Sequence, residues 1–84
     1  MKITFKLFAT LSDFLPPEAK RTNSLQLEVA EGTTPQALID RFHLPPAMCK
    51  LVLVDGTYVA PEERALRALR EGETLAIWPP VAGG

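Results

Sequence analysis

One main helical segment lies among five short stretches that have the pattern of β-strands. The helical segment begins at Pro35, can be capped by Thr33 or Thr34, and ends before Pro45-Pro46. Proline is favoured in the first turn of a helix, where its missing N–H group needs no partner. Strands mixed with a single main helix in this way predict an α+β domain in which a sheet packs on that helix.

The first and the last strand-like stretches determine the expected order of the sheet. In residues 2–7, Ile3, Phe5 and Leu7 alternate with polar residues, which is typical of a half-buried strand. Residues 74–78 form the final strand, after a turn at Glu71-Gly72. Because the first strand is followed by a long connection and the last strand needs a neighbour, we expect a mixed sheet with these two strands parallel at its centre.

The remaining elements follow from local patterns. Residues 25–29 and 51–54 predict two further strands, and Asp55-Gly56 predicts a hairpin turn back through residues 57–60. Helical spacing over residues 7–15 predicts a short helix that ends at Pro16-Pro17, and residues 61–69 predict a short helical or irregular crossing. The side chains expected on the buried side of the main helix are Ala37, Leu38, Ile39 and Phe42.

Composition excludes several classes of function. The chain has 84 residues with a formal net charge of -1, which indicates one domain over residues 1–84, with a core at 1–78 and a tail at 79–84. A near-neutral chain is a poor binder of nucleic acid. No apolar run reaches the ~20 residues of a membrane span. The polar and apolar alternation of residues 1–6 does not fit a signal peptide, so we expect a cytoplasmic protein without a membrane partner.

Cys49 and His43 are the only cysteine and the only histidine, so neither a disulfide framework nor a structural zinc site can be built from them. We interpret Cys49 as a buried structural thiol, because an unpaired cysteine usually behaves as a small apolar residue. His43 follows the main helix and is expected at its C-terminal end. We expect no bound metal and no bound cofactor.

The charged residues of 62–70 do not form a catalytic pattern. Arg64, Arg67 and Arg70 recur every three residues, and Glu63 precedes Arg67 by four, as in a weak helical ion pair. We interpret the three arginines as a solvent-facing surface, with contact to a partner as a second possibility. Glu62 and Glu63 are not an acid and base pair, because neighbours in a helix point to different sides.

The last six residues, "PPVAGG", combine a stiff base with a bare end. Pro79 and Pro80 cannot donate to a sheet, so they end the last strand and direct the chain away from it. The four residues that follow, Val81-Ala82-Gly83-Gly84, reach about 13–14 Å when extended. Such a thin segment suits entry into the active site of a partner enzyme. We therefore expect the carboxyl group of Gly84 to be the reactive group.

Three aromatic residues are candidates for a docking surface near this tail. Phe8 follows Leu7 and is expected on the face opposite the core, and Trp78 follows the inward-facing Ile77. If the first and last strands are parallel neighbours, Phe8 and Trp78 lie at the same end of the sheet, where Tyr58 could join them. An exposed aromatic cluster there would bind a partner protein, whereas a role in the core is the alternative.

The sequences "LFATLSDFL", "VDGTYV" and "LREGETLAIWPPVAGG", with the element order above, resemble the ubiquitin-like sulfur carriers of the MoaD/ThiS family. The resemblance covers nearly the whole chain, and the small subunit of molybdopterin synthase is the most similar type. It implies the β-grasp fold. It also implies that an E1-like enzyme, using ATP and magnesium, adenylates Gly84. Sulfur from a sulfur donor protein would then convert the Gly84 adenylate to a thiocarboxylate.

The resemblance also implies that the chain is a protein co-substrate, a non-catalytic small subunit whose sulfur passes to molybdopterin in the large subunit of the synthase. Gly83 and Gly84 match the terminal pair of the family. Carriers for thiamine, cysteine synthesis and transfer-RNA thiolation share this ending, so another sulfur-accepting enzyme is an alternative partner. A ubiquitin-like modifier joined to lysines through Gly84, and a plain interaction module, are the other two classes of function that the sequence leaves open.

Overall fold

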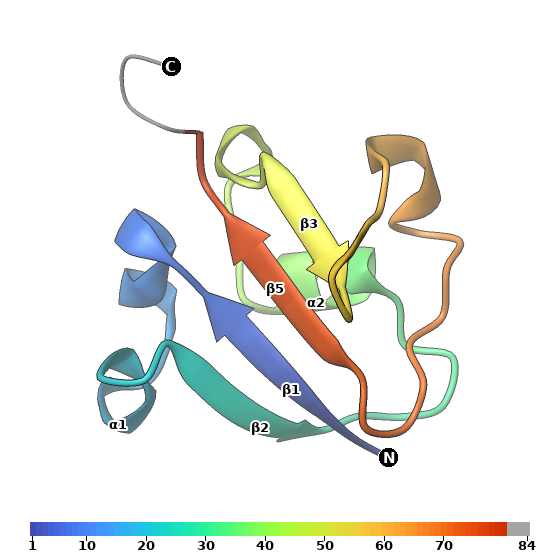
Figure 1. Cartoon of the computed structure of the whole chain (residues 1–84), viewed down its shortest axis with the longest axis horizontal. Coiled ribbons are helices and arrows are strands. Elements are labelled where there is room, and N and C mark those ends of the chain that lie inside the picture. Colours follow the sequence, from blue (N-terminus) through green and yellow to red (C-terminus); the bar gives the residue numbers. More distant parts are fainter. Residues whose placement is uncertain (81–84) are drawn as a thin grey trace.

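A five-stranded sheet with the order β2-β1-β5-β3-β4 forms the centre of the molecule in a computed structural model that describes residues 1–80 (Figure 1). The strands are β1 (Lys2–Leu7), β2 (Ser24–Glu28), β3 (Leu51–Val54), β4 (Thr57–Tyr58) and β5 (Thr74–Trp78). The main helix is α2 (Pro35–Arg41), and a shorter helix is α1 (Pro17–Lys20). Three 3-10 turns complete the fold: η1 (Ala9–Phe14), η2 (Pro46–Met48) and η3 (Pro61–Glu63).

β1 and β5 are parallel neighbours, and each completes its pairing with an antiparallel strand on its other side. Thr4 pairs with Thr74, and the register continues to Leu7 opposite Ile77. β2 flanks β1, whereas β3 flanks β5. The predicted mixed sheet with the first and last strands parallel is therefore confirmed. Both strands end at the same side of the molecule (Figure 1).

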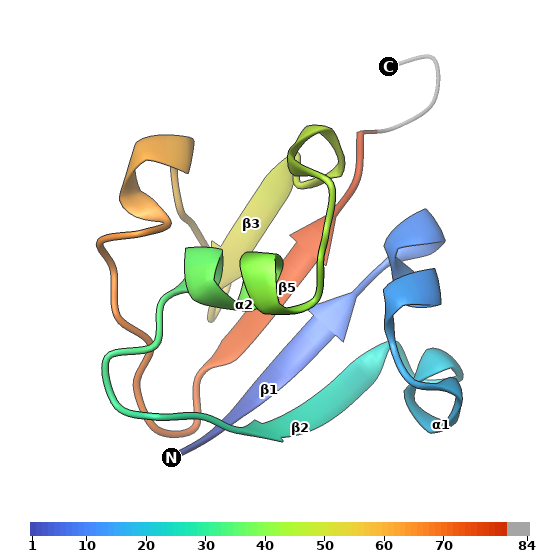
Figure 2. The same cartoon turned by 180° about the vertical axis from the view of Figure 1, so that it is seen from behind.

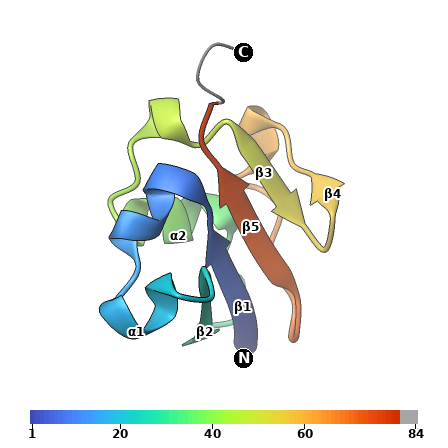
Figure 3. The same ribbon diagram turned by 60° about the vertical axis from the view of Figure 1, so that its left-hand side comes forward.

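The core lies between the sheet and α2, which packs on one face only (Figure 2). Alternation decides which strand residues enter it, because successive side chains of a strand point to opposite faces. The fully buried strand residues, each at most 1% exposed, are Ile3, Phe5, Leu7, Val52, Val54, Leu75 and Ile77. The outer face of the sheet carries the alternate residues, and β4 forms its far edge (Figure 3).

α2 begins and ends with local hydrogen bonds that its sequence supplies. The Thr34 hydroxyl accepts a hydrogen bond from the Ala37 N–H at 3.1 Å, so Thr34 is the cap and Pro35 the first helical residue, as predicted. After the helix His43 adopts a left-handed φ of 57°, and the next residue, Leu44, donates to the Ile39 carbonyl at 3.0 Å. This is a Schellman motif, in which the left-handed backbone of His43 ends the helix.

One expected detail of the helices is wrong. Ala37 is exposed, because the buried side of α2 consists of Pro35, Leu38 and Ile39. The short helix predicted from the spacing over residues 7–15 is confirmed; it is the 3-10 helix η1, in which Leu11 is buried. The proline pair that follows does more than end this turn, because Pro17 is also the first residue of α1.

The β3–β4 hairpin turns at Asp55 and Gly56, which have φ values of 48° and 83°. Two positive φ values in succession define the tight turn that Asp-Gly favours, so this prediction is confirmed. β4 has two residues rather than the four predicted. After Tyr58 the Val59 N–H still donates to the Val52 carbonyl at 2.8 Å, but the Val59 side chain is buried and Pro61 then begins η3.

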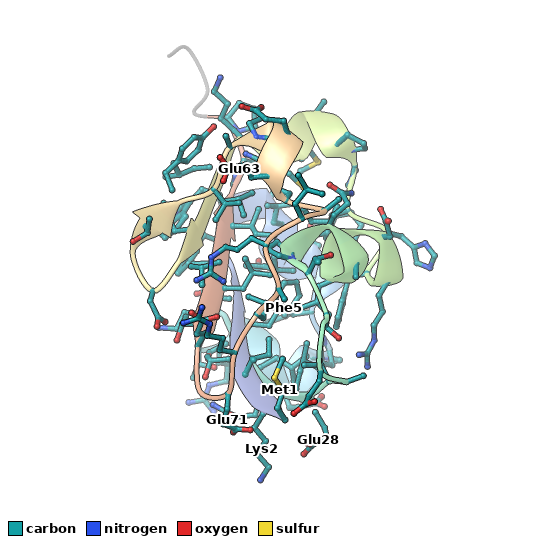
Figure 4. The ribbon with its side chains drawn as sticks, turned by 90° about the vertical axis from the view of Figure 1, so that its right-hand side faces the viewer. Met1, Lys2, Phe5, Glu28, Glu63 and Glu71 are labelled. Atoms are coloured by element: carbon teal, nitrogen blue, oxygen red, sulfur yellow. The ribbon has the colours of Figure 1, made fainter. Side chains whose placement is uncertain are left out.

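At the end of the molecule opposite Glu63, the start of β1 is bonded both to the end of β2 and to the turn before β5 (Figure 4). The Met1 ammonium donates to the Val29 carbonyl at 2.8 Å and lies 3.0 Å from a Glu28 carboxylate oxygen. The Lys2 N–H donates to the Glu71 carboxylate at 3.1 Å, which links β1 to the turn before β5. Within residues 1–80 no helix is long and apolar enough to cross a membrane.

Candidate functional site

β5 carries the chain from the core to the proline pair that precedes the last four residues. Ile77 is fully buried, Trp78 and Pro79 are partly exposed, and Pro80 is exposed. The Trp78 carbonyl accepts a hydrogen bond from the Lys50 N–H at 3.1 Å, so the backbone stays paired through residue 78. Neither proline can extend this pairing, because proline has no N–H group. The predicted reactive and tail residues, Val81, Ala82, Gly83 and Gly84, lie outside the described residues.

Phe8 and Trp78 stack face to face at the end of the parallel strand pair. Their ring centroids are 4.2 Å apart, and the angle between the ring planes is 5°. The Phe8 N–H donates to the Ile77 carbonyl at 3.2 Å, which extends the strand pairing by one residue beyond Leu7. Both side chains are partly exposed on the face opposite the core. The sequence-based expectation of where these two residues lie is therefore met, and their role in binding stays a prediction.

Tyr58 lies on the same outer face but further along it. It pairs with Leu53 across the hairpin, and Leu53 pairs with Ala76 on β5, so their side chains project from the same face. The Tyr58 side chain is 52% exposed. Trp78 instead pairs with Leu51, so two leucines of β3 lie between the Phe8–Trp78 stack and Tyr58.

Leu51 and Leu53 belong to this surface, although sequence reasoning did not single them out. Leu51 is 39% exposed, which is unusual for a large apolar residue in a strand next to the centre of a sheet. The signal is present in the alternation of β3: Val52 and Val54 enter the core, so the leucines between and before them must face outward. We call the surface formed by Phe8, Leu51, Leu53, Tyr58 and Trp78 the aromatic face.

Cys49 has the properties of a structural thiol, as expected. It is 5% exposed, and its sulfur lies 3.5 Å from the Pro45 carbonyl oxygen. Burial raises the pKa of the Cys49 thiol, and the positive charge of Arg64 only partly opposes this. The thiol is therefore neutral at pH 7, whereas a nucleophilic cysteine needs a lowered pKa.

The expected solvent-facing arginine surface is wrong for Arg64, and the expected Glu63–Arg67 ion pair is also wrong. Arg64 is 7% exposed and donates from Nε to the Val59 carbonyl at 3.0 Å and from Nη1 to the Cys49 carbonyl at 2.9 Å. Arg67 pairs with Glu73 rather than with Glu63, at 2.8 Å between Nη2 and Oε2. The chain is helical only over η3 in this region, so the spacing of the arginines does not place them on one side. Arg70 is exposed and the Arg67 side chain is 36% exposed, so these two face solvent as expected.

Within residues 1–80 no group of three or more histidine, cysteine, aspartate or glutamate side chains is placed to hold a metal ion. The candidate site is thus an apolar face beside the segment that leads to Gly84.

A mixed sheet with its first and last strands parallel at the centre, covered by one main helix, is the β-grasp fold of ubiquitin-like proteins. The family model of the ThiS family matches residues 5–84. The chain belongs to the ThiS family, in agreement with its resemblance to the ubiquitin-like sulfur carriers. A search of curated protein sequences found no match.

Solved structures share the fold at low sequence identity. SAMP1 from Haloferax volcanii is 23% identical, with both chains fully covered and a TM-score of 0.68. A putative molybdopterin converting factor, subunit 1, from Pyrococcus furiosus is 19% identical over 96% of this chain and 99% of that one, with a TM-score of 0.65. A complex of subunits 1 and 2 of the molybdopterin-converting factor from Helicobacter pylori contains a chain that is 11% identical, with both chains fully covered and a TM-score of 0.59.

Proposed function

We propose that this protein carries sulfur as a thiocarboxylate at Gly84. The observation that carries the proposal is the match to the ThiS family, which extends through the terminal Gly83-Gly84 pair. The partly exposed apolar face beside the start of the tail supports it, because such a face suits docking of a partner protein. In this proposal the protein is a co-substrate that other enzymes act on.

The chemistry begins with a carboxylate that is a poor electrophile. An E1-like enzyme that uses ATP and magnesium would let a Gly84 carboxylate oxygen attack the α-phosphate, releasing pyrophosphate and forming an acyl-adenylate. Hydrosulfide released from a donor protein would then attack the carbonyl carbon, forming a C–S bond as the C–O bond to AMP breaks, so that AMP leaves and a thiocarboxylate remains. Glycines at the end suit this step, because they allow partner backbone to come close.

The aromatic face is proposed to dock the enzymes that act on the tail. Trp78 is the last residue of β5, so a protein that covers the Phe8–Trp78 stack also lies beside the start of the tail. Large aromatic residues are frequent among those that contribute most to binding energy. Pro79 and Pro80 would keep the tail extended between this face and the active site.

The proposed destination of the sulfur is molybdopterin, in the large subunit of molybdopterin synthase. Structures described as subunit 1 of the molybdopterin-converting factor share the fold, and one of them is a complex with subunit 2. These similarities favour a two-subunit enzyme in which this chain is the small subunit. Thiamine, cysteine and transfer-RNA thiolation are the alternative destinations, because the tail chemistry is the same in each.

The decisive experiment is incubation of the full chain with an E1-like enzyme, ATP, magnesium and a sulfur donor, followed by intact-mass measurement. The expected product gains the mass difference between one sulfur and one oxygen atom, located at Gly84 by fragmentation. Larger adducts joined to lysine would instead identify a protein modifier. No reaction with several E1-like enzymes would favour a plain interaction module and would contradict the proposal.

Three variants make this assay specific for the tail. Deletion of Gly83 and Gly84 leaves the carboxyl group roughly 7 Å short of its catalytic position and should abolish the reaction. One residue added after Gly84 should be nearly as harmful, since it places the Gly84 carboxyl in a peptide bond. Cys49→Ala is the matched control and should react like the unmodified chain, because the thiol is buried.

A further inference from the structure

A cavity of about 330 Å³ lies on the side of the molecule where α2, η2 and η3 meet the hairpin. Its buried lining includes Ile39, Cys49 and Arg64, which are at most 7% exposed. Its outer lining includes Lys50, Tyr58 and Pro61, which are exposed to solvent. The cavity is thus open at one side and deep enough to reach a buried arginine.

Arg64 connects three segments that surround the cavity. Its carbonyl accepts a hydrogen bond from the Gln36 N–H of α2 at 2.8 Å, while Nε and Nη1 bond the carbonyls of Val59 and Cys49. Nη2 is buried and has no hydrogen-bond partner. A buried guanidinium normally has its donors satisfied, since an unpaired buried charged group is strongly destabilising.

The charge of Arg64 is also not balanced by an acidic side chain. The two ion pairs found within residues 1–80 are Met1–Glu28 and Arg67–Glu73, and neither involves Arg64. No aspartate or glutamate is among the described residues that line the cavity. Lys50, which is exposed, adds a second positive charge to the cavity lining, and Tyr58 also lines the cavity. Two cations, an unsatisfied donor and no carboxylate form an environment that favours an anion.

We propose that this cavity is a binding site for a small oxyanion, of the phosphate, sulfate or carboxylate class. Arg64 supplies the buried charge and, at Nη2, the donor that lacks a partner. Lys50 and Tyr58 supply the donors at the opening. The site uses none of the last four residues, so it stands whether or not Gly84 carries sulfur.

The test is a titration of the isotope-labelled full chain with inorganic phosphate, followed by two-dimensional NMR at constant ionic strength. Saturable shifts are expected for the amides of Ala47, Cys49 and Lys50 and for the Nε–H of Arg64. Chloride at matched ionic strength should leave these signals unchanged. Acetate in a parallel titration distinguishes a site for carboxylates from one for phosphate, and saturation by either supports the proposal.

Matched lysine variants keep the test interpretable, because Arg64→Ala removes two buried hydrogen bonds and could unfold the chain. Lys50→Gln changes an exposed side chain and should weaken phosphate binding about fivefold, as expected for the loss of one partly exposed charge interaction. Lys20→Gln, on the distant helix α1, should leave the affinity unchanged. Shifts that stay linear with phosphate, or equal effects of the two lysine variants, would overturn the proposal and leave Arg64 as a structural link only.

Discussion

The Trp78 indole lies parallel to the Phe8 ring at a centroid distance of 4.2 Å, and this pair joins the ends of the two central strands on the outer face of the sheet. An aromatic pair can stabilise a fold or bind a partner, and the two roles respond differently to substitution. The exposure of both rings makes the binding role the larger one in our proposal.

Trp78→Ala should weaken binding of the E1-like enzyme much more than it lowers the melting temperature of the free chain. The loss of the stacked pair should reduce the free energy of unfolding by about 0.5–1.5 kcal/mol, in addition to the loss from the apolar surface that the indole buries. A hot-spot residue of an interface changes binding by ~2 kcal/mol or more. Calorimetric titration and thermal melts on the same samples measure both. A large fall in melting temperature with unchanged affinity would assign Trp78 to the core.

Phe8→Ala and Trp78→Ala should not be additive in the stability of the free chain. Because each ring is the stacking partner of the other, the double variant should lose less stability than the sum of the single variants. The expected coupling energy is about 0.5–1.5 kcal/mol. Urea unfolding of the four proteins measures it, and Tyr58→Ala paired with Phe8→Ala is the control without a direct contact. Additive single effects for Phe8 and Trp78 would show that the stack contributes little.

Deleting Gly83 and Gly84 should leave the fold stable while it abolishes sulfur transfer. The core strands end at Trp78, so the deletion removes no described contact, and we expect a change of at most ~0.5 kcal/mol in unfolding free energy. Thermal melts of the deleted and full chains check this. Unfolding of the deleted chain would mean that the tail contributes to the structure.

Alkaline pH should destabilise the protein through Cys49. Burial raises the pKa of this thiol in the folded state, so the unfolded chain loses the thiol proton first as pH rises through its ordinary value of about 8.5. Stability is then lost with increasing pH, because the folded state binds more protons than the unfolded one. Urea unfolding between pH 7 and 10 should show a smaller alkaline loss for Cys49→Ala. Parallel curves for the two proteins would contradict this account.

Acidic pH should weaken the Arg67–Glu73 ion pair, which lies immediately before β5. Hydrogen bonds from Arg67 hold the pKa of the Glu73 carboxyl below its usual value, so this contribution is present above about pH 4.3 and is lost as pH falls through the lower folded pKa. Arg67 is 36% exposed, so solvent screens the pair and we expect Glu73→Gln to lose about 1 kcal/mol at pH 7. The difference between the two proteins should shrink toward pH 3, which acid unfolding curves can measure. Glu63→Gln is the control, since Glu63 forms no ion pair with Arg67 in the structure.

Strand positions were predictable because alternation is a local signal that burial enforces. Ile3, Phe5 and Leu7 could be assigned to the core from spacing alone, and the outward position of Trp78 followed from Ile77. The Asp55-Gly56 turn was also predictable, because its positive φ values limit the residues that fit. These signals act over a few residues and need no knowledge of the rest of the fold.

Arg64 and residues 7–15 show the limits of local patterns. The partners of Arg64 are carbonyls at positions 49 and 59, in segments whose approach depends on the complete fold. The spacing of three along residues 64–70 therefore placed Arg64 on a solvent-facing surface, whereas its side chain is buried. In residues 7–15 the spacing of the apolar residues fits both a 3-10 helix and an α-helix. The structure forms the 3-10 helix η1, with Leu11 buried in the core.

β5 lies between β1 and β3 although it is the last strand in the sequence. Synthesis therefore produces two separate halves, β1 with β2 and β3 with β4, whose inner edges stay unpaired until residues 74–78 arrive. Unpaired strand edges promote aggregation. A chain that stops before β5 is therefore expected to aggregate rather than to form part of the domain. The segment that leads to Gly84 follows the strand that closes the sheet. If a partner binds the Phe8–Trp78 stack, as we propose, it would therefore meet only chains in which β5 has already joined the sheet.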